Sequence, residues 1–104
     1  MAPEPQWTVD IEELGRCGLI HYRERENSAL FDWEFAAAPA VVLIWPRDAN
    51  QWEQIHPWAF GRKVEIMENV ARDVCRQKAP ACSFKIDEAN SLINIFEPSK
   101  NPTP

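Results

Sequence analysis

Apolar and polar side chains alternate along two segments in the first half of the chain, and a third segment that follows them is apolar throughout. The clearest is Leu30–Phe35, which places three aromatic side chains on one face and the carboxylates of Asp32 and Glu34 on the other. This period of two is typical of a half-buried strand. Gly18–Arg23 alternates in the same way, and Ala40–Trp45 is apolar on both faces, as in an interior strand covered on each side. Short links between the three segments predict an antiparallel meander.

Helical periodicity replaces this alternation after a connector. Apolar side chains recur at i, i+4, i+7, i+11 and i+14, at Phe60, Val64, Met67, Ala71 and Val74. The spacing predicts an amphipathic helix over Pro57–Lys78. Pro57 suits the first helical position and Pro80 stops the chain from continuing the helix. We expect the apolar stripe to pack on the aromatic face of Leu30–Phe35.

The remaining elements are shorter. Ser83–Asp87 and Leu92–Glu97 alternate again and are expected to form a hairpin. A short helical turn is expected after Thr8, where Asp10 and Glu13 have the spacing of a capping box. The resulting order, βββ–α–ββ, predicts an α+β fold with an antiparallel β-sheet and one long amphipathic helix packed on one face.

The chain has the size and composition of a single domain. Its 104 residues are 45% hydrophobic, enough to bury a core without metal ions or disulfides. Five of its nine prolines lie near the two ends. Proline lacks an amide donor, so we expect flexible tails at 1–6 and 98–104 around one domain at 7–97.

Charge is distributed unevenly along the chain. Residues 1–56 carry ten acidic and four basic side chains, a balance of −6, and residues 57–104 carry six and seven, a balance of +1; together they give −5. An acidic protein attracts cationic partners and repels nucleic acid, so we expect another protein, of cationic character, as partner and no nucleic acid.

Location is inferred from further patterns. No run of about 18 apolar residues occurs, and no secretion signal is recognised, so we expect no membrane association. Cys17, Cys75 and Cys82 lack Cys-x-x-Cys spacing and are expected to be free thiols in a reducing cytoplasm.

The connector Trp45–Lys63, which runs from the end of the last meander strand into the start of the helix, is the most unusual part of the sequence. It contains three of the five tryptophans together with much of the basic character of the chain. Tryptophan is enriched where proteins recognise partners. The expected partner-binding residues are Arg47, Trp52, His56, Trp58, Arg62 and Lys63, with Asp32 and Glu34 as an acidic face. Alternatively, Trp52 and Trp58 turn inward and cover the sheet.

Residue types that support catalysis show no convincing pattern. The two histidines, His21 and His56, have no acidic or cysteine partner at a motif spacing. Cys82 follows the C-terminal end of the expected helix, whose dipole disfavours a thiolate. We therefore expect no catalytic residues, no metal site and no cofactor.

Two functions remain in view. The favoured one is a small acidic, non-catalytic protein-interaction module of the inhibitor, toxin-immunity or adaptor type. The alternative is a small ligand-binding domain or enzyme that acts on an anionic compound. Its four candidate groups are His56, Arg47, Arg62 and Lys63. Convergence of these groups in one pocket would favour the alternative, and an exposed surface would favour the interaction module.

A homodimer is a further expectation. A five-stranded antiparallel sheet has two edges, and natural edges are commonly paired, covered or charged. The last strand carries apolar side chains on both faces, including Phe96. We expect Phe96 or the connector tryptophans to be buried if two copies associate.

Overall fold

The computed structural model describes residues 6–37 and 40–98. Its strands are β1 (Trp7–Glu13), β2 (Cys17–Glu24), β3 (Asn27–Phe35), β4 (Ala40–Pro46), β5 (Ser83–Asp87) and β6 (Leu92–Phe96). Its helices are the 3-10 turn η1 (Ala49–Gln51), the one-turn helix α1 (Trp52–Ile55), the 3-10 turn η2 (Pro57–Ala59) and the long helix α2 (Lys63–Lys78). Apart from Gln6 and Pro98, the expected tails lie outside the described residues.

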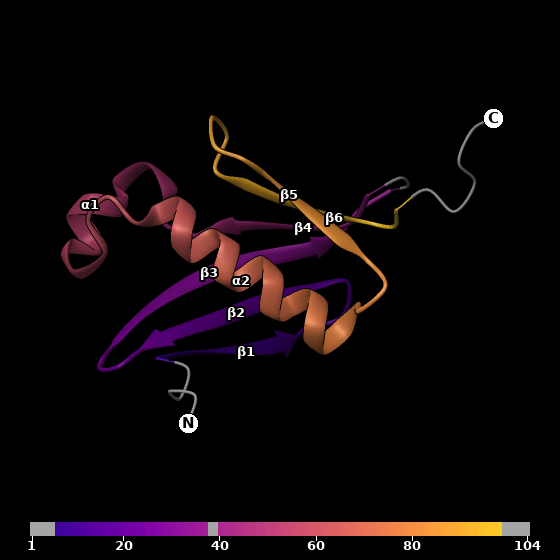
Figure 1. Cartoon of the computed structure of the whole chain (residues 1–104), viewed down its shortest axis with the longest axis horizontal. Helices are drawn as coiled ribbons and strands as arrows, with labels where there is room; N and C mark the ends of the chain where they lie inside the picture. Colours follow the sequence, from indigo (N-terminus) through magenta and orange to yellow (C-terminus); the bar gives the residue numbers. More distant parts are fainter. Residues whose placement is uncertain (1–5, 38–39, 99–104) are drawn as a thin grey trace, which may run out of the picture.

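The strands form one antiparallel sheet in the order β1-β2-β3-β4-β6-β5. The helix α2 lies across one face of this sheet (Figure 1). The predicted α+β class, with one long helix on one face of an antiparallel sheet, is therefore confirmed. The helix α2 crosses the sheet and connects β4 to the last two strands. Of these, β6 pairs with β4, and β5 lies at the edge of the sheet.

The first element corrects a prediction, because it is a sixth strand and not a helical turn. β1 pairs with β2 from Trp7 opposite Glu24 to Glu13 opposite Gly18. Val9 is buried in the core and Ile11 packs against it, which is the alternation of a strand. The capping-box spacing is a local signal, and a helix this short is stable only with tertiary support. Here the available tertiary contact is strand pairing with β2, which stabilises an extended segment and not a helix.

The long helix begins six residues later than predicted, at Lys63. Gly61 has a φ of 73°, a left-handed conformation that interrupts a helix. Phe60, expected on the apolar stripe, is consequently outside the helix and 72% exposed. Met67, Ala71 and Val74 are buried as expected, whereas Val64 is only half-buried. Among the described residues, no helix is long and apolar enough to cross a membrane.

Two of the three aromatic side chains expected in the core from β3 are there. Phe31 is fully buried and Trp33 is 6% exposed. The indole N–H of Trp33 donates to the carbonyl oxygen of Glu12 at 3.1 Å, which ties the end of β1 to the sheet. Phe35, at the end of the strand, is 50% exposed, and its ring lies edge-to-face with that of Trp33, with centroids 5.2 Å apart. The prediction that Phe35 is buried was wrong.

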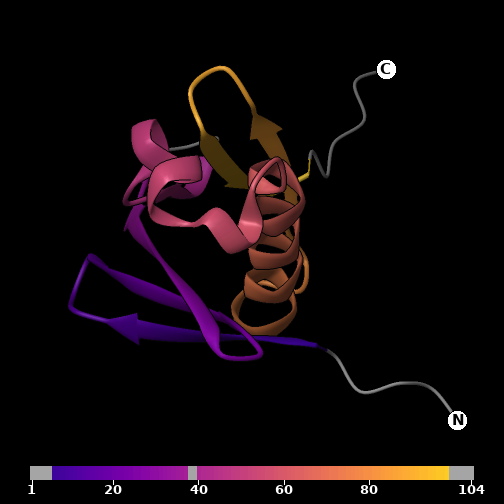
Figure 2. The same cartoon turned by 90° about the vertical axis from the view of Figure 1, so that its left-hand side faces the viewer.

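The apolar strand β4 has one face covered by α2 and one that no described helix covers. Ile44 and Val42 point to the helix side, where they belong to the core or pack against it. Leu43 and Trp45 point the other way, and Figure 2 shows the long helix α2 on one side of the sheet. The expectation of a cover on each face is not met in the part of the chain that the structure describes.

Candidate functional site

The sheet face opposite α2, which we call the open face, is the candidate site. Its residues alternate with those that pack under the helix, so their side chains point away from the core. Six of its apolar side chains are half-buried: Leu19, Leu30, Leu43, Trp45, Leu92 and Phe96. Contiguous exposed apolar surface on a protein commonly marks an interaction site. The two-faced apolar pattern of β4 was the sequence signal for this surface, although it was interpreted as a buried strand.

A hollow of about 420 Å³ lies on the β2–β4 part of the open face. Leu19, Asp32 and Trp45 stand next to one another on three adjacent strands, because Asp32 pairs with Leu19 on one side and Trp45 on the other. Arg47 closes the row through two hydrogen bonds to the Asp32 carboxylate, at 2.8 and 3.3 Å. These bonds raise the pKa of Arg47 above its usual value. Glu34 also lines the hollow.

This half of the open face carries more acidic than basic groups. On β1 to β3 and at the end of β4, its carboxylates and arginines are Asp10, Glu12, Asp32, Glu34, Arg23 and Arg47. Four carboxylates against two guanidinium groups leave an excess of two negative charges. Glu12 also lies 3.3 Å from the imidazole of His21. The predicted acidic face at Asp32 and Glu34 is thus part of a larger acidic surface, although Asp32 is itself paired.

Asn94 adds a polar group in the middle of the other half. It lies on β6 between Leu43 of β4 and Lys85 of β5. Its Oδ1 is buried, and among the described residues no group donates a hydrogen bond to it.

The connector expected to carry the site instead closes one end of the core. Trp52 is 2% exposed, its indole N–H donates to the carbonyl oxygen of Ala59 at 3.0 Å, and its ring packs 6.4 Å from that of Phe31. It cannot offer surface to a partner, so its assignment to a partner-binding surface was wrong. Trp58 is half-buried, with its ring 5.9 Å from that of His56.

His56 is also part of this end cap. It is 6% exposed, packs 4.5 Å from the ring of Trp52, and places its Nε2 3.7 Å from a carboxylate oxygen of Asp48. Burial lowers the pKa of His56 from its usual 6.5, and the Asp48 carboxylate offsets only part of that shift. The buried imidazole is therefore held in its neutral form, as a structural group.

This burial predicts a pH dependence of stability. Because the pKa of His56 is lower in the folded than in the unfolded chain, the unfolded chain binds the proton first as pH falls below 6.5. We expect the free energy of unfolding to drop as pH falls through 6.5 toward the folded value. Urea denaturation at pH 7.5 and 5.5 measures the drop, and it should shrink in His56→Gln. An equal drop in the variant would contradict the assignment.

Arg62 has a structural partner at the start of α2. Its guanidinium makes a two-pronged contact with Glu24 of β2, at 2.9 and 3.0 Å, and a second one with Glu65, at 2.7 and 3.1 Å. Glu24 also accepts a hydrogen bond from the hydroxyl group of Tyr22 at 2.7 Å. The hydrogen bonds from Arg62 lower the pKa of Glu24. This network fastens the beginning of the helix to β2, which explains a cation in a position that the helix dipole disfavours.

The four basic groups of the anionic-ligand hypothesis are not brought together. Arg47 lies on the open face with Asp32, and Arg62 binds Glu24 and Glu65 on the helix side. The Nζ of Lys63 donates to the hydroxyl of Ser91 in the β5–β6 turn at 2.6 Å. His56 is buried beside Asp48. Each group already faces a partner in the domain, so the geometry lends the anionic-ligand hypothesis no support.

The three cysteines differ in their exposure to solvent. Cys17 is exposed, Cys82 is half-buried and Cys75 is buried in α2, and all three are free thiols. Burial raises the pKa of the Cys75 thiol, which disfavours its reactive thiolate. Within 6–37 and 40–98, no group of three or more His, Cys, Asp or Glu side chains is placed to hold a metal ion.

The chain has no significant match to a protein-family model, to a curated protein or to a solved structure.

Proposed function

We propose that the protein is a non-catalytic interaction module that binds a basic segment of another protein on its open face. The observation that supports this most is the location of a half-buried tryptophan, Trp45, in an acidic hollow on a sheet face that no described helix covers. An apolar surface with a charged surround is the usual composition of a protein interface. The inhibitor, toxin-immunity and adaptor classes all fit such a surface.

The hollow has the chemistry to accept a lysine or arginine side chain. Glu34 lines it and is exposed, and Glu12 lies one strand beyond Leu19 and is exposed as well. A cation on Glu34 would enter the hollow that Trp45 also lines, and aromatic rings favour cations over their faces. Asp32 already forms an ion pair with Arg47. Its carboxylate is therefore not left as an unpaired charge when a partner covers the open face.

The apolar part of the open face would supply most of the binding energy. Leu43, Leu92 and Phe96 continue the surface from Trp45 across β6. Covering such side chains contributes roughly 25 cal/mol per Å² of apolar area removed from water. The acidic surround then selects for basic partners and against the phosphates of nucleic acid.

Binding through the open face predicts that charge reversal there abolishes capture of the partner. The test variant is Glu12→Lys with Glu34→Lys, because both side chains are exposed. The matched control is Glu68→Lys with Glu88→Lys, which makes the same change in net charge on exposed positions of α2 and the β5–β6 turn. Immobilised wild type and variants are compared by quantitative capture from an extract of the source cells, with thermal melting as the check on folding.

We expect a protein that the wild type and the control capture, and that the Glu12/Glu34 variant releases at least tenfold more readily, with similar melting temperatures for all three. Loss in both variants, or in neither, would contradict binding at the open face. Sedimentation of the same proteins reports on the other occupant, a second copy of this chain. A dimer that forms through Phe96 and excludes the captured protein would replace the proposed partner.

A further inference from the structure

A second cavity lies on the other side of the sheet, between the C-terminal half of α2 and the strands. Its volume is about 220 Å³. Ile20 and Ile44 from the sheet and Val74 from α2 contribute to its apolar walls. An apolar cavity of about 150 Å³ is large enough to bind benzene, so this one can take a substituted ring or a short alkyl chain. None of the described acidic side chains of the open face lines this cavity.

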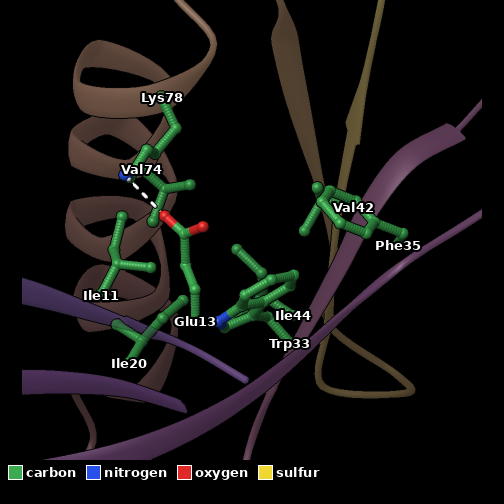
Figure 3. A pocket seen from close by; sticks show the side chains of 9 residues that line it. All are labelled: Ile11, Glu13, Ile20, Trp33, Phe35, Val42, Ile44, Val74 and Lys78. Carbon is green, nitrogen blue, oxygen red and sulfur yellow. Dashed lines mark ion pairs between the residues drawn. The ribbon is translucent and has the colours of Figure 1, made fainter. Parts of the chain in front are cut away.

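The mouth of the cavity is charged. Glu13, at the end of β1, and Lys78, the last residue of α2, form an ion pair of 2.7 Å across it, with 57% and 51% of their side chains exposed. Figure 3 shows the Glu13 side chain standing among the lining residues, with one carboxylate oxygen paired with Lys78. Because both side chains are half-exposed, the pair can open without burying an unpaired charge.

Three features make the mouth better suited to a cation than to an anion. The Glu13 carboxylate extends among the lining residues. Two aromatic rings, Trp33 and Phe35, line the cavity and can face a cation. The mouth also lies at the C-terminal end of α2, where the helix dipole contributes partial negative charge. Lys78 currently provides the positive charge, and its flexible stem allows it to move into solvent.

We infer that this cavity binds a small amphipathic amine, with its apolar body between the sheet and α2 and its ammonium group on Glu13 in place of Lys78. The ligand class is a primary alkyl or arylalkyl amine with one ring or a short chain. This inference does not rest on the proposed function, because the cavity and the open face lie on opposite sides of the sheet, and Trp33 is the one described residue that lines both the cavity and the hollow.

The test uses 3-phenylpropylamine as probe, with 3-phenylpropan-1-ol and 3-phenylpropionate as uncharged and anionic analogues. Binding is followed by NMR on methyl-labelled full-length protein. The methyl groups of Ile11, Ile20 and Ile44 report on the cavity. Those of Leu30 and Leu92 report on the open face. Titrations are repeated on Glu13→Gln and Lys78→Met, which change only the exposed pair at the mouth.

We expect the amine to shift the isoleucine methyl signals and not the leucine signals, and to bind more tightly than either analogue. Glu13→Gln should weaken amine binding about two- to fivefold and Lys78→Met should strengthen it by a similar factor, the range for a half-exposed ion pair. Binding that is equal for amine and alcohol in all three proteins would overturn the inference. So would isoleucine signals that stay unchanged at millimolar amine, or shifts confined to the leucines.

Discussion

Replacing Trp52 with alanine is expected to lower the free energy of unfolding by about 3–5 kcal/mol, as for other large-to-small changes in protein cores. The side chain is 2% exposed, fills the space beside Phe31 and donates a hydrogen bond to the carbonyl of Ala59. Alanine would leave a cavity and remove one of two hydrogen bonds to the Ala59 carbonyl oxygen, which also accepts the amide of Arg62 at 2.9 Å. A domain of this size is stable by about 5–15 kcal/mol, so the loss is a large part of the total.

Urea denaturation with fluorescence and circular dichroism measures this loss, and Trp58→Ala is the matched control. Trp58 belongs to the same connector but is only half-buried, so its removal should cost less than half as much. If Trp52→Ala does not fold, Trp52→Phe keeps most of the volume and removes the hydrogen bond to Ala59. Equal stability of the two alanine variants would show that Trp52 does not hold the end of the core.

Gly18→Ala is expected to destabilise the domain by about 1–3 kcal/mol, the usual cost of overpacking, although it adds only one methyl group. A Cβ atom at Gly18 would overlap the backbone oxygen of Glu12 and lie 2.7 Å from Nε1 of Trp33. These two atoms are joined by the hydrogen bond that holds the end of β1 to the sheet. Backbone cannot yield as a flexible side chain does, so the methyl group must separate β1 from β2.

Thermal melting of Gly18→Ala beside Cys17→Ala tests this close packing. Cys17 is the preceding residue on β2 and is exposed, so its replacement should change stability by less than about 0.5 kcal/mol. A Gly18→Ala protein as stable as the wild type would mean that the first strand is free to shift. Hydrogen exchange of the β1 amides should accelerate in Gly18→Ala and not in the control.

The elements predicted most accurately are those whose signals are local and repeated. Alternation in β3 and the helical spacing of Met67, Ala71 and Val74 each reflect burial of one continuous face, which is visible in the sequence itself. The errors arose where contacts between residues distant in the sequence determine the local structure. β1 is a strand because β2 is available to pair with it. Phe60 leaves the helix because the next residue, Gly61, takes a left-handed conformation that its neighbours alone do not dictate.

The candidate site was predicted only in part for a similar reason. Asp32, Glu34 and Arg47 were assigned from their types and positions, and all three lie on the open face. Trp52 and His56 could not be placed, because a tryptophan-rich connector can equally turn toward a core or toward a partner. What decides is a contact between residues distant in the sequence, the packing of the Trp52 ring beside Phe31 of β3.

The position of β6 between β4 and β5 has a consequence for the order in which the domain assembles. The first four strands follow one another as neighbours, so their pairings close short loops. β6 reaches β4 by pairing Ile44 with Ile93, residues separated by 93 − 44 = 49 positions. Such distant pairing has a larger loop-closure cost and slows folding. The β1–β4 meander can thus organise early, and the last hairpin completes the sheet when α2 brings it back to the middle strand.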